Sequence, residues 1–589
     1  MNLIGKIVIT FNDIFPDEEP KTINEYLDGI DKELLLKFGT FLLGFSQNSK
    51  YENPLEFLKM YFSQENQEFF NKVLSGLDQF IKQTKWDIDS YAFPYVASSL
   101  SFFENAFDKE YGITKNYTNQ EIEIRVFKAY LLFNKFHTTD RTFILDDSLK
   151  YLKEDASKYA TAYCIGLFLN NSDLVNYDVK KVFTIQVLRA ISFLEFLESR
   201  NDTKELLKEF YKEYDISNYQ EYIKRLLPIQ IAVLKKEKEA HTDINITQNE
   251  GKESSISFLN KFSIKESELL KDFDFRNIRS APMYRFDENT FRLIFPLFVL
   301  ELIGNGLYFK FKHINDRLPK EKKVKDLYGL KTYDFSEKYI LHKILKEYFG
   351  NRYFQKNGDE LDAQYNGAPD YYVRNGKKIF LFESKDILIN AIAKQSSDFG
   401  EIEKELFIKL YKNEEGKPKA VLQFINNIRK ILSKKLEFDS NYNPKNIIVY
   451  PVLVLHYRIF NTAGLNKWIN FWFQEELDKL EKEGFNISNI KPLILIDIDT
   501  LIFHKEIFAG RKLSLEEVLN EYGNDYINFT VKGKKYKSEE DVIQASKNSF
   551  IPFGHYLDNK IDLKKLREAP KELMEKTYGL FGNNKNPLE

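Results

Sequence analysis

The sequence predicts an α+β multidomain protein, with a helical amino-terminal half followed by an α/β domain on a central mixed sheet. Two observations predict this fold class. In the first half, apolar residues recur every three or four positions over long segments. After Lys331 the pattern changes to helices that alternate with short, continuously apolar strands.

Length and composition limit the classes of protein to consider. A chain of 589 residues is too long for one core, so several domains are expected. The formal net charge of −2 gives no overall attraction to a polyanion, so any nucleic-acid surface must be a local patch. The single cysteine, Cys164, excludes an internal disulfide framework and a cysteine-rich zinc site, and it favours the cytoplasm.

The sequence does not predict a membrane protein. Its longest apolar stretches, within 292–304 and 446–460, are shorter than the about 20 apolar residues that a spanning helix needs. The first residues lack the charged start, apolar middle and cleavage site of a signal peptide. We therefore expect a soluble, cytoplasmic protein with no membrane partner.

The first half is predicted to be helical. Helical spacing is clearest over 119–136, 178–199 and 218–237, and Pro228 should kink or split the last of these helices. The segment 236–255 is polar and lacks aromatic residues, which is typical of an exposed linker. We assign 1–240 to a helical recognition or regulatory domain.

A second helical part is predicted over 256–330. It contains a helix-like apolar segment at 288–311 and then a basic stretch at 312–331. This stretch is interpreted as a solvated connector, with a phosphate-contacting segment as the alternative. We assign 331–510 to the α/β domain and 511–589 to a carboxy-terminal extension.

The α/β domain begins with a helix over 334–350, which Gly350 is well placed to end. Two strands flank the Asn375-Gly376 step, and an amphipathic helix follows at 419–432. The segments 446–456 and 491–499 are continuously apolar, as in strands of a parallel or mixed sheet that are buried on both faces.

The strands around Asn375-Gly376 carry three charged residues to one place. Glu383 and Lys385 are two residues apart, so they share a face of their strand. A two-residue loop at Asn375-Gly376 would place Asp370 opposite Leu381, and a four-residue loop would place it opposite Glu383. Both registers put Asp370 on the face of Glu383 and Lys385, whereas a three-residue loop or a bulge would not.

Two carboxylates and an ammonium at one place suit a particular chemistry. Two carboxylates that lie close together repel each other, and a divalent cation removes that conflict. Oxygen ligands favour Mg²⁺ or Mn²⁺, which can lower the pKa of a bound water and offset charge on a phosphate. Lys385 could orient or deprotonate that water, or balance the phosphate charge. These parts fit phosphodiester hydrolysis.

The motif Pro369-Asp370 followed by Glu383-Ser384-Lys385 resembles the active-site signature of the PD-(D/E)XK nuclease superfamily. The resemblance covers about 334–455 and implies a restriction-endonuclease-like core of helix, three strands, helix and strand. It implies that Asp370 and Glu383 ligate the metal, that the Ser384 carbonyl adds a ligand, and that Lys385 acts on the water. Family members often add a glutamate from the preceding helix, for which Glu337 is the matching residue.

Two positions in the flanking helices have alternative interpretations. Glu337 extends the apolar stripe of its helix toward the sheet, or it closes a capping box over 334–337. RecB-like members of the family carry Gln-x-x-x-Tyr in the second helix. This chain has Gln423, but Asn427 stands where the tyrosine would be. Helical angle places Gln423 on a polar face, interpreted as solvated, with backbone-phosphate contacts as the alternative.

The sequence therefore predicts a metal-dependent nuclease with Asp370, Glu383, Lys385 and Glu337 at its centre. DNA is the expected substrate and RNA the alternative, because most members of the family that it resembles cut DNA. The layout resembles prokaryotic restriction and antiphage effectors. A catalytically inactive scaffold or nucleic-acid-binding subunit with the same fold is the rival hypothesis, and the helical half could mediate a homo-oligomer or bind a protein partner.

Overall fold

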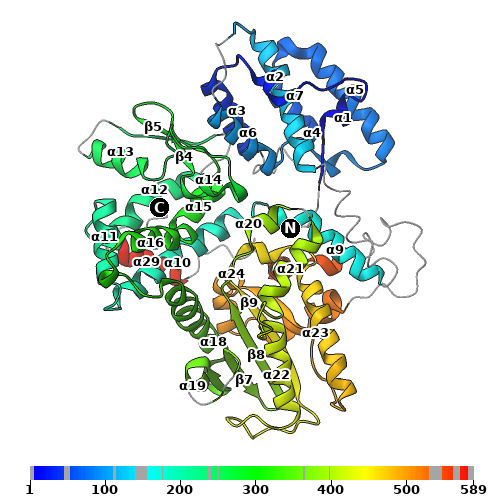
Figure 1. Cartoon of the computed structure of the whole chain (residues 1–589), viewed down its shortest axis with the longest axis vertical. Coiled ribbons are helices and arrows are strands. Elements are labelled where there is room, and N and C mark those ends of the chain that lie inside the picture. The colour runs from blue at the N-terminus through cyan, green and yellow to red at the C-terminus, as the bar shows by residue number, and fades with distance from the viewer. Residues whose placement is uncertain are drawn as a thin grey trace.

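The computed structural model describes residues 6–45, 53–109, 115–138, 155–175, 177–234, 241–247, 251–362, 365, 367–396, 398–528, 547–561 and 571–581. The first part of the chain forms a helical lobe at the top of Figure 1, coloured blue. A short parallel pair, β1 (Ile7–Val8) and β2 (Tyr91–Ala92), lies within it. Its helices are α1 (Phe11–Ile14), α2 (Ile23–Leu27), α3 (Lys32–Phe45), α4 (Pro54–Tyr61), α5 (Gln67–Thr84), α6 (Val96–Asp108) and α7 (Asn119–Thr138).

A second helical part follows. The prediction for 119–136 matches α7 of the lobe, and the prediction for 178–199 matches α10. The prediction for 218–237 matches α12 up to Leu234, and 235–237 lie outside the described residues. Pro228 does not split α12. Burial of the apolar side chains around Pro228 offsets the about 3 kcal/mol that a proline costs inside a helix. The helices are α9 (Ala156–Phe168), α10 (Val179–Glu198), α11 (Lys204–Tyr214), α12 (Tyr219–Leu234), α13 (Lys252–Asn260), α14 (Arg276–Ser280), α15 (Pro296–Ile303) and α16 (Asn305–Arg317).

Two predictions between 236 and 311 need correction. The predicted linker contains a strand, β3 (Asp243–Asn245), which pairs antiparallel with β5 (Thr290–Leu293). The predicted helix-like segment begins with that strand β5 before α15 starts, and β4 (Met283–Arg285) completes the sheet in the order β3-β5-β4. The buried Arg292 on β5 donates to both carboxylate oxygens of Asp243, a pairing that the local sequence pattern does not reveal.

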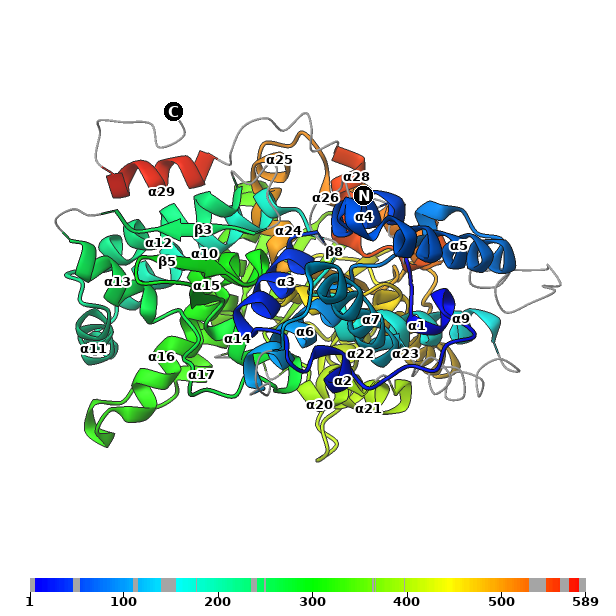
Figure 2. The same cartoon turned by 90° about the horizontal axis from the view of Figure 1, so that it is seen from above.

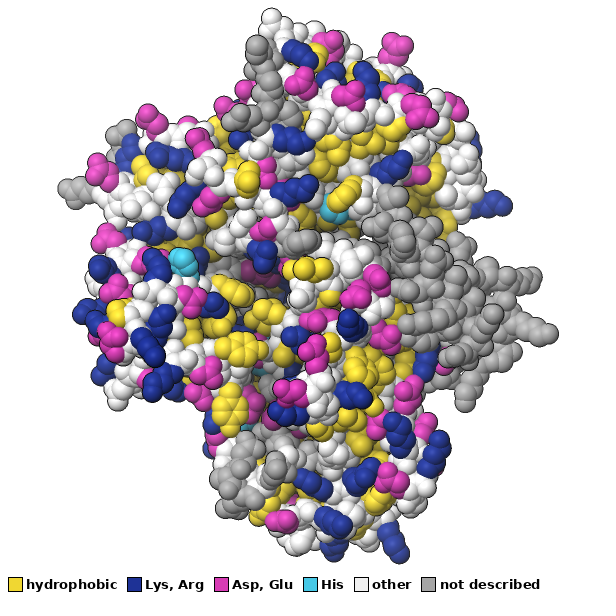
Figure 3. Space-filling model, viewed as in Figure 1, with side chains coloured by type: hydrophobic (Ala, Val, Ile, Leu, Met, Phe, Trp, Pro, Cys, Tyr) yellow, Lys and Arg dark blue, Asp and Glu magenta, His cyan; other side chains and the backbone are white. Residues whose placement is uncertain are grey.

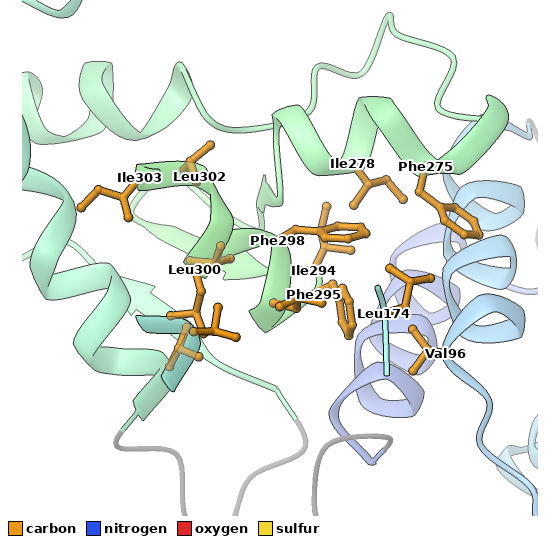
Figure 4. Packing of buried hydrophobic residues seen from close by; sticks show 14 of the residues in the cluster. Val96, Leu174, Phe275, Ile278, Ile294, Phe295, Phe298, Leu300, Leu302 and Ile303 are labelled. Carbon is orange, nitrogen blue, oxygen red and sulfur yellow. The ribbon is translucent and has the colours of Figure 1, made fainter. Parts of the chain in front are cut away.

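The helical lobe and the second part share one core. Figure 4 shows Val96 of α6 beside Leu174, with Phe295 pointing toward Leu174. All three side chains are buried in the same hydrophobic cluster, which continues onto one face of the large sheet. The helical half is therefore packed against the rest of the chain through a continuous apolar core.

The carboxy-terminal half contains a five-stranded mixed sheet in the order β10-β9-β8-β7-β6. β6–β7 and β7–β8 are antiparallel, whereas β8–β9 and β9–β10 are parallel. The prediction of a mixed sheet with strands buried on both faces is confirmed at β9 and β10. The strands are β6 (Phe354–Asn357), β7 (Tyr371–Asn375), β8 (Lys378–Lys385), β9 (Ile448–Leu455) and β10 (Ile494–Asp497).

Helices cover both faces of this sheet (Figure 1). One face packs with α18 (His342–Phe349), α26 (Leu515–Tyr522) and α28 (Phe553–Ile561). The other packs with α21 (Phe399–Leu410), α22 (Ala420–Leu432) and α23 (Leu465–Lys482), and α9 joins this second layer. The predicted helix over 419–432 is therefore confirmed as α22. The smaller helices of this half are α17 (Leu327–Gly329), α19 (Gly358–Asp362), α20 (Ala391–Gln395), α24 (Ile498–Phe503), α25 (Lys505–Ala509) and α29 (Lys571–Phe581).

The helix predicted over 334–350 is longer than the sequence pattern indicates. It consists of a π-helix, η7 (Leu330–Leu341), that runs directly into α18. Gly350 follows α18 with a φ of 61°, a left-handed angle that glycine adopts without strain, so the predicted stop is confirmed. Stretches of π-helix occur often at functional sites, so the side chains of η7 are candidates for such a site.

A buried ionic cluster joins the helical parts to the sheet-bearing part. Lys394 on α20 lies 2.9 Å from Asp173 and 2.5 Å from Asp274. Arg279 on α14 lies 2.7 Å from the same Asp173. Its charges come from segments far apart in the sequence, so it fixes how these segments pack together.

Candidate functional site

The β7–β8 hairpin sets the register of the predicted site. Asn375 pairs with Lys378, and Tyr371 pairs with Phe382. The loop is therefore the two residues Gly376 and Lys377, one position later than the Asn375-Gly376 loop considered above, and Gly376 has a φ of 57°. This pairing, continued by one residue, places Asp370 opposite Glu383, which is the second of the two registers expected from the sequence.

The structure brings Asp370, Glu383 and Lys385 together. The Lys385 ammonium Nζ lies 3.1 Å from Glu383 Oε2 and 3.5 Å from Asp370 Oδ2. Both carboxylates contact the same nitrogen, so their nearest oxygens are no farther apart than the sum of these two distances. The condition on which the sequence prediction depended, a shared face for these three side chains, is met.

Backbone contacts hold Asp370 in place. The Ser384 amide N–H donates to Asp370 Oδ2 at 2.6 Å, and the Gly358 amide N–H donates to the Asp370 carbonyl at 2.8 Å. His342 Nε2 lies 3.1 Å from the same carbonyl oxygen and therefore carries the proton that it donates. One carboxylate oxygen of Asp370 is thus directed toward the end of β8 before any ligand arrives.

Glu337 reaches this place from the helix on the opposite side of the sheet. Its side chain is buried, and Oε1 lies 4.0 Å from His342 Nε2. Its charge is one of those that raise the pKa of Lys385. The capping-box alternative is wrong, because Glu337 lies inside η7 and the nearby Ser336 hydroxyl donates to Asp386 instead.

The electrostatics of the site centre on Lys385. Burial lowers the pKa of its ammonium, but the charges of Asp370, Glu383 and Glu337 outweigh burial and hold that pKa well above its usual value. Lys385 is therefore protonated at neutral pH. In this arrangement it acts as a counter-charge and hydrogen-bond donor, and it is unsuited to remove a proton from water.

Alternation along β8 places a second polar set on the other face of the strand. Ser384 and Asp386 point away from the carboxylate pair: Ser384 Oγ lies 2.9 Å from His456 Nε2, and Asp386 accepts from Ser336 Oγ at 2.5 Å. The Lys331 ammonium pairs with Asp386 and lies 2.9 Å from Tyr457 Oη. These buried contacts fasten η7, and with it Glu337, to the end of β8 and β9.

Ser384 is the one residue of this second set that was predicted at the site, through its carbonyl; the others were not predicted. Asp386 follows the Glu383-Ser384-Lys385 motif directly, and Lys331 lies in the basic stretch interpreted as a solvated connector. Lys331 is buried, so that interpretation is wrong for this residue. Period-two alternation could have indicated that Asp386 faces the helix, but its partners depend on tertiary packing.

The surroundings of Gln423 on α22 also differ from the predicted solvated face. Its side-chain oxygen Oε1 is buried, and it has no hydrogen-bond partner among the described residues. The face of α22 that carries Gln423 is thus partly covered and is not fully solvated. His342 is a buried residue that supports the site through its contact with the Asp370 carbonyl.

The donor chemistry of the site fits a hard divalent cation. Asp370, Glu383 and Glu337 offer carboxylate oxygens, and the Ser384 carbonyl belongs to the same strand end. In the described part of the chain, no group of three or more His, Cys, Asp or Glu side chains is placed so that it could hold a metal ion. Lys385 occupies the position between two of the carboxylates, so the ammonium supplies their counter-charge in this structure.

Comparisons with family models, curated proteins and solved structures find no match to this chain. The described helices include none that combines the length and apolar character needed to cross a bilayer. The geometry of the site is therefore the basis for assigning a function.

Proposed function

We propose that this protein is a metal-dependent nuclease that hydrolyses phosphodiester bonds, with Asp370, Glu383, Lys385 and Glu337 at its active site. One observation carries the proposal. A single ammonium contacts two carboxylates on one face of a strand end, and a third carboxylate contributes to the same local charge. A scaffold has no evident need for this combination of residue types at this position.

The order of elements around the site supports the proposal. A long helix precedes β6, β7 and β8, the helices α20–α22 follow, and β9 then adds parallel to β8. This is the order of helix, three strands, helix and strand in the PD-(D/E)XK family, which the motif resembles. The candidate residues occupy the carboxyl end of β8 and the residue before β7, as in that family's signature.

Each residue of the chain has a role that its contacts support. Asp370 and Glu383 would hold Mg²⁺ or Mn²⁺, with the Ser384 carbonyl and Glu337 as further oxygen donors. When bound, such an ion lowers the pKa of a coordinated water and offsets charge on the phosphate. The Ser384 amide orients Asp370, and the protonated Lys385 would stabilise negative charge on the scissile phosphate.

The second candidate function is a non-catalytic nucleic-acid-binding or scaffold subunit. The observation that favours it is the ion pairing itself, because Lys385 neutralises both carboxylates in the absence of a metal. Under this alternative, the three residues form a structural ionic contact between β7 and β8. The two functions differ in whether a divalent ion displaces Lys385 from the carboxylates.

A cleavage assay tests the proposal. Supercoiled plasmid, single-stranded circular DNA and a labelled RNA are incubated with the purified protein and Mg²⁺, Mn²⁺ or EDTA. Cleavage should require the metal and should disappear in Asp370→Ala and Lys385→Ala. Lys378→Ala is the matched control, because Lys378 begins the same strand and pairs with Glu516 away from the site.

A second measurement covers the case of a nuclease that is inactive without a trigger. Mn²⁺ binding by isothermal titration calorimetry should be measurable for wild type and for Lys378→Ala, and it should be lost in Asp370→Ala. Equal Mn²⁺ binding by wild type and Asp370→Ala would contradict the assigned metal site. Cleavage that survives both site substitutions would show that this centre is not responsible.

A further inference from the structure

The surface beside the proposed active site carries exposed aromatic rings. Tyr328 is 55% exposed and Tyr333 is 38% exposed, both high values for large side chains. Tyr328 Oη donates to the backbone carbonyl of Asp386 at 3.3 Å, one residue after Lys385. Tyr333 lies four residues before Glu337 in η7, so both rings lie on elements that build the site.

The ring of Tyr333 is held in a fixed place. The Lys338 ammonium lies 4.0 Å from its ring centroid, one turn of π-helix later in the chain, and Lys338 also pairs with Asp359. An exposed ring that is already held in position loses little conformational entropy when a ligand stacks on it. We call Tyr328 and Tyr333 the aromatic edge; the first ring is held by the Asp386 carbonyl and the second by Lys338.

Apolar side chains continue this edge on the segment that leaves β8. Leu388 is 46% exposed and Ile392 is 63% exposed. Figure 3 shows the face of the molecule hollowed near its middle, with hydrophobic side chains gathered below the hollow. Aliphatic and aromatic side chains are exposed on segments that flank the proposed active site in the chain, where a polar surface would otherwise be expected.

Exposed basic side chains precede this edge in the sequence. Seen from above in Figure 2, α16 and the turn after it project from the body of the molecule. Lys320 and Lys325 are exposed on the segment that follows α16, and neither has an ion-pair partner among the described residues. Lys325 precedes Tyr328 by three residues, so an exposed positive charge and an exposed ring lie close together in the sequence.

We infer that the strand entering the active site is single-stranded, with unpaired bases stacked on Tyr328 and Tyr333 and phosphates contacting Lys320 and Lys325. This inference rests on the proposed nuclease function. In a duplex the flat faces of the bases are stacked on each other, so they are not available to stack on exposed rings of the protein. A single strand offers both faces of each base, and aromatic rings beside basic side chains are the usual surface that binds it.

Binding without cleavage tests the inference. Fluorescence anisotropy in EDTA compares a labelled oligothymidine of about 20 nucleotides with a duplex of the same length. Replacing one stacking ring costs about 1–3 kcal/mol, so Tyr328→Ala and Tyr333→Ala should each weaken single-strand binding by about 5- to 150-fold. Duplex binding should change by less than about twofold in either variant.

Matched variants separate stacking from other effects. Tyr333→Phe keeps the ring and should retain single-strand binding. Trp86→Ala removes a ring of similar exposure, 39%, far from the site and should have no effect. Replacing Lys320 and Lys325 together by Ala should reduce the salt dependence of single-strand binding by about 0.7 per lysine that contacts a phosphate.

The outcomes distinguish this inference from the proposed function. Equal losses for duplex and single strand, or unchanged single-strand binding in both alanine variants, would overturn the inference, even if metal-dependent cleavage is observed. Selective loss of single-strand binding would support the inference even in a protein that does not cut. Preferred cleavage of duplex over single-stranded DNA by wild type would also contradict it.

Discussion

Replacing Lys385 by methionine removes the counter-charge of the site and keeps most of the volume of the side chain. At an effective dielectric constant of about 20, each of its two contacts, at 3.1 Å and 3.5 Å, contributes about 5 kcal/mol of attraction before desolvation is counted. Removing one partner of a buried ion pair costs about 3–5 kcal/mol, because the other charge stays buried. Glu383 is fully buried, so the upper part of that range applies.

The assay is thermal unfolding in EDTA, followed by intrinsic fluorescence. For a folding unit of about 150–250 residues, 1 kcal/mol shifts Tm by about 2–4 °C, so a loss of about 4–5 kcal/mol in Lys385→Met should lower Tm by roughly 8–20 °C at neutral pH. Lys378→Met is the control, because its half-exposed pair with Glu516 is worth only about 0–1 kcal/mol. Adding Glu383→Gln to Lys385→Met should recover much of the loss, since the repulsion from Asp370 disappears.

The pH dependence of stability gives an independent check that Lys385→Met loses a counter-charge. In Lys385→Met one of the two carboxyls should have a raised pKa in the folded state, so the folded state binds more protons than the unfolded state above about pH 4.3. Stability should then fall as pH rises, by up to about 1.4 kcal/mol per unit. In wild type, the raised pKa of Lys385 stabilises the protein below its usual value of about 10.4, so this group adds no slope near neutral pH. A Lys385→Met protein with the same Tm as wild type between about pH 5.5 and 8.5 would refute the reasoning.

Three further predictions concern the contacts that surround the site. Ser336→Ala removes a buried hydrogen bond to the charged Asp386 and should lower the free energy of unfolding by about 1.5–3 kcal/mol in urea titrations; an unchanged urea midpoint would contradict the role of this contact. Lys394→Met leaves Asp173 with one cation fewer in the buried cluster and should expose 155–234 to limited proteolysis earlier than in wild type; an identical digestion pattern would argue against coupling through this cluster. Burial lowers the pKa of His456 to about 3, so the unfolded state binds the extra proton below about pH 6.5 and stability should fall by up to about 1.4 kcal/mol per unit as pH falls. His456→Asn should flatten that fall, and parallel pH profiles for the two proteins would show that His456 does not cause it.

Much of the fold follows from local pattern. The spacing of apolar residues predicted α7, α10, α12 and α22, because a helix with one apolar stripe can bury it only against a neighbour. Continuous apolar runs predicted β9 and β10, since strands buried on both faces need apolar side chains at every position. The prediction was wrong for the polar segment before α13, because the strand β3 depends on a partner about 45 residues later in the chain.

The sequence by itself determined that Asp370, Glu383 and Lys385 share a face, because side-chain alternation and a tight hairpin permit few other arrangements. Tertiary structure alone decided what stands on the opposite face of β8. There Ser336 and Lys331 meet Asp386, and His456 meets Ser384, through packing of helix on sheet between segments distant in the sequence. Local pattern fixes the direction of a side chain, whereas its partner depends on which distant segment the core brings against it.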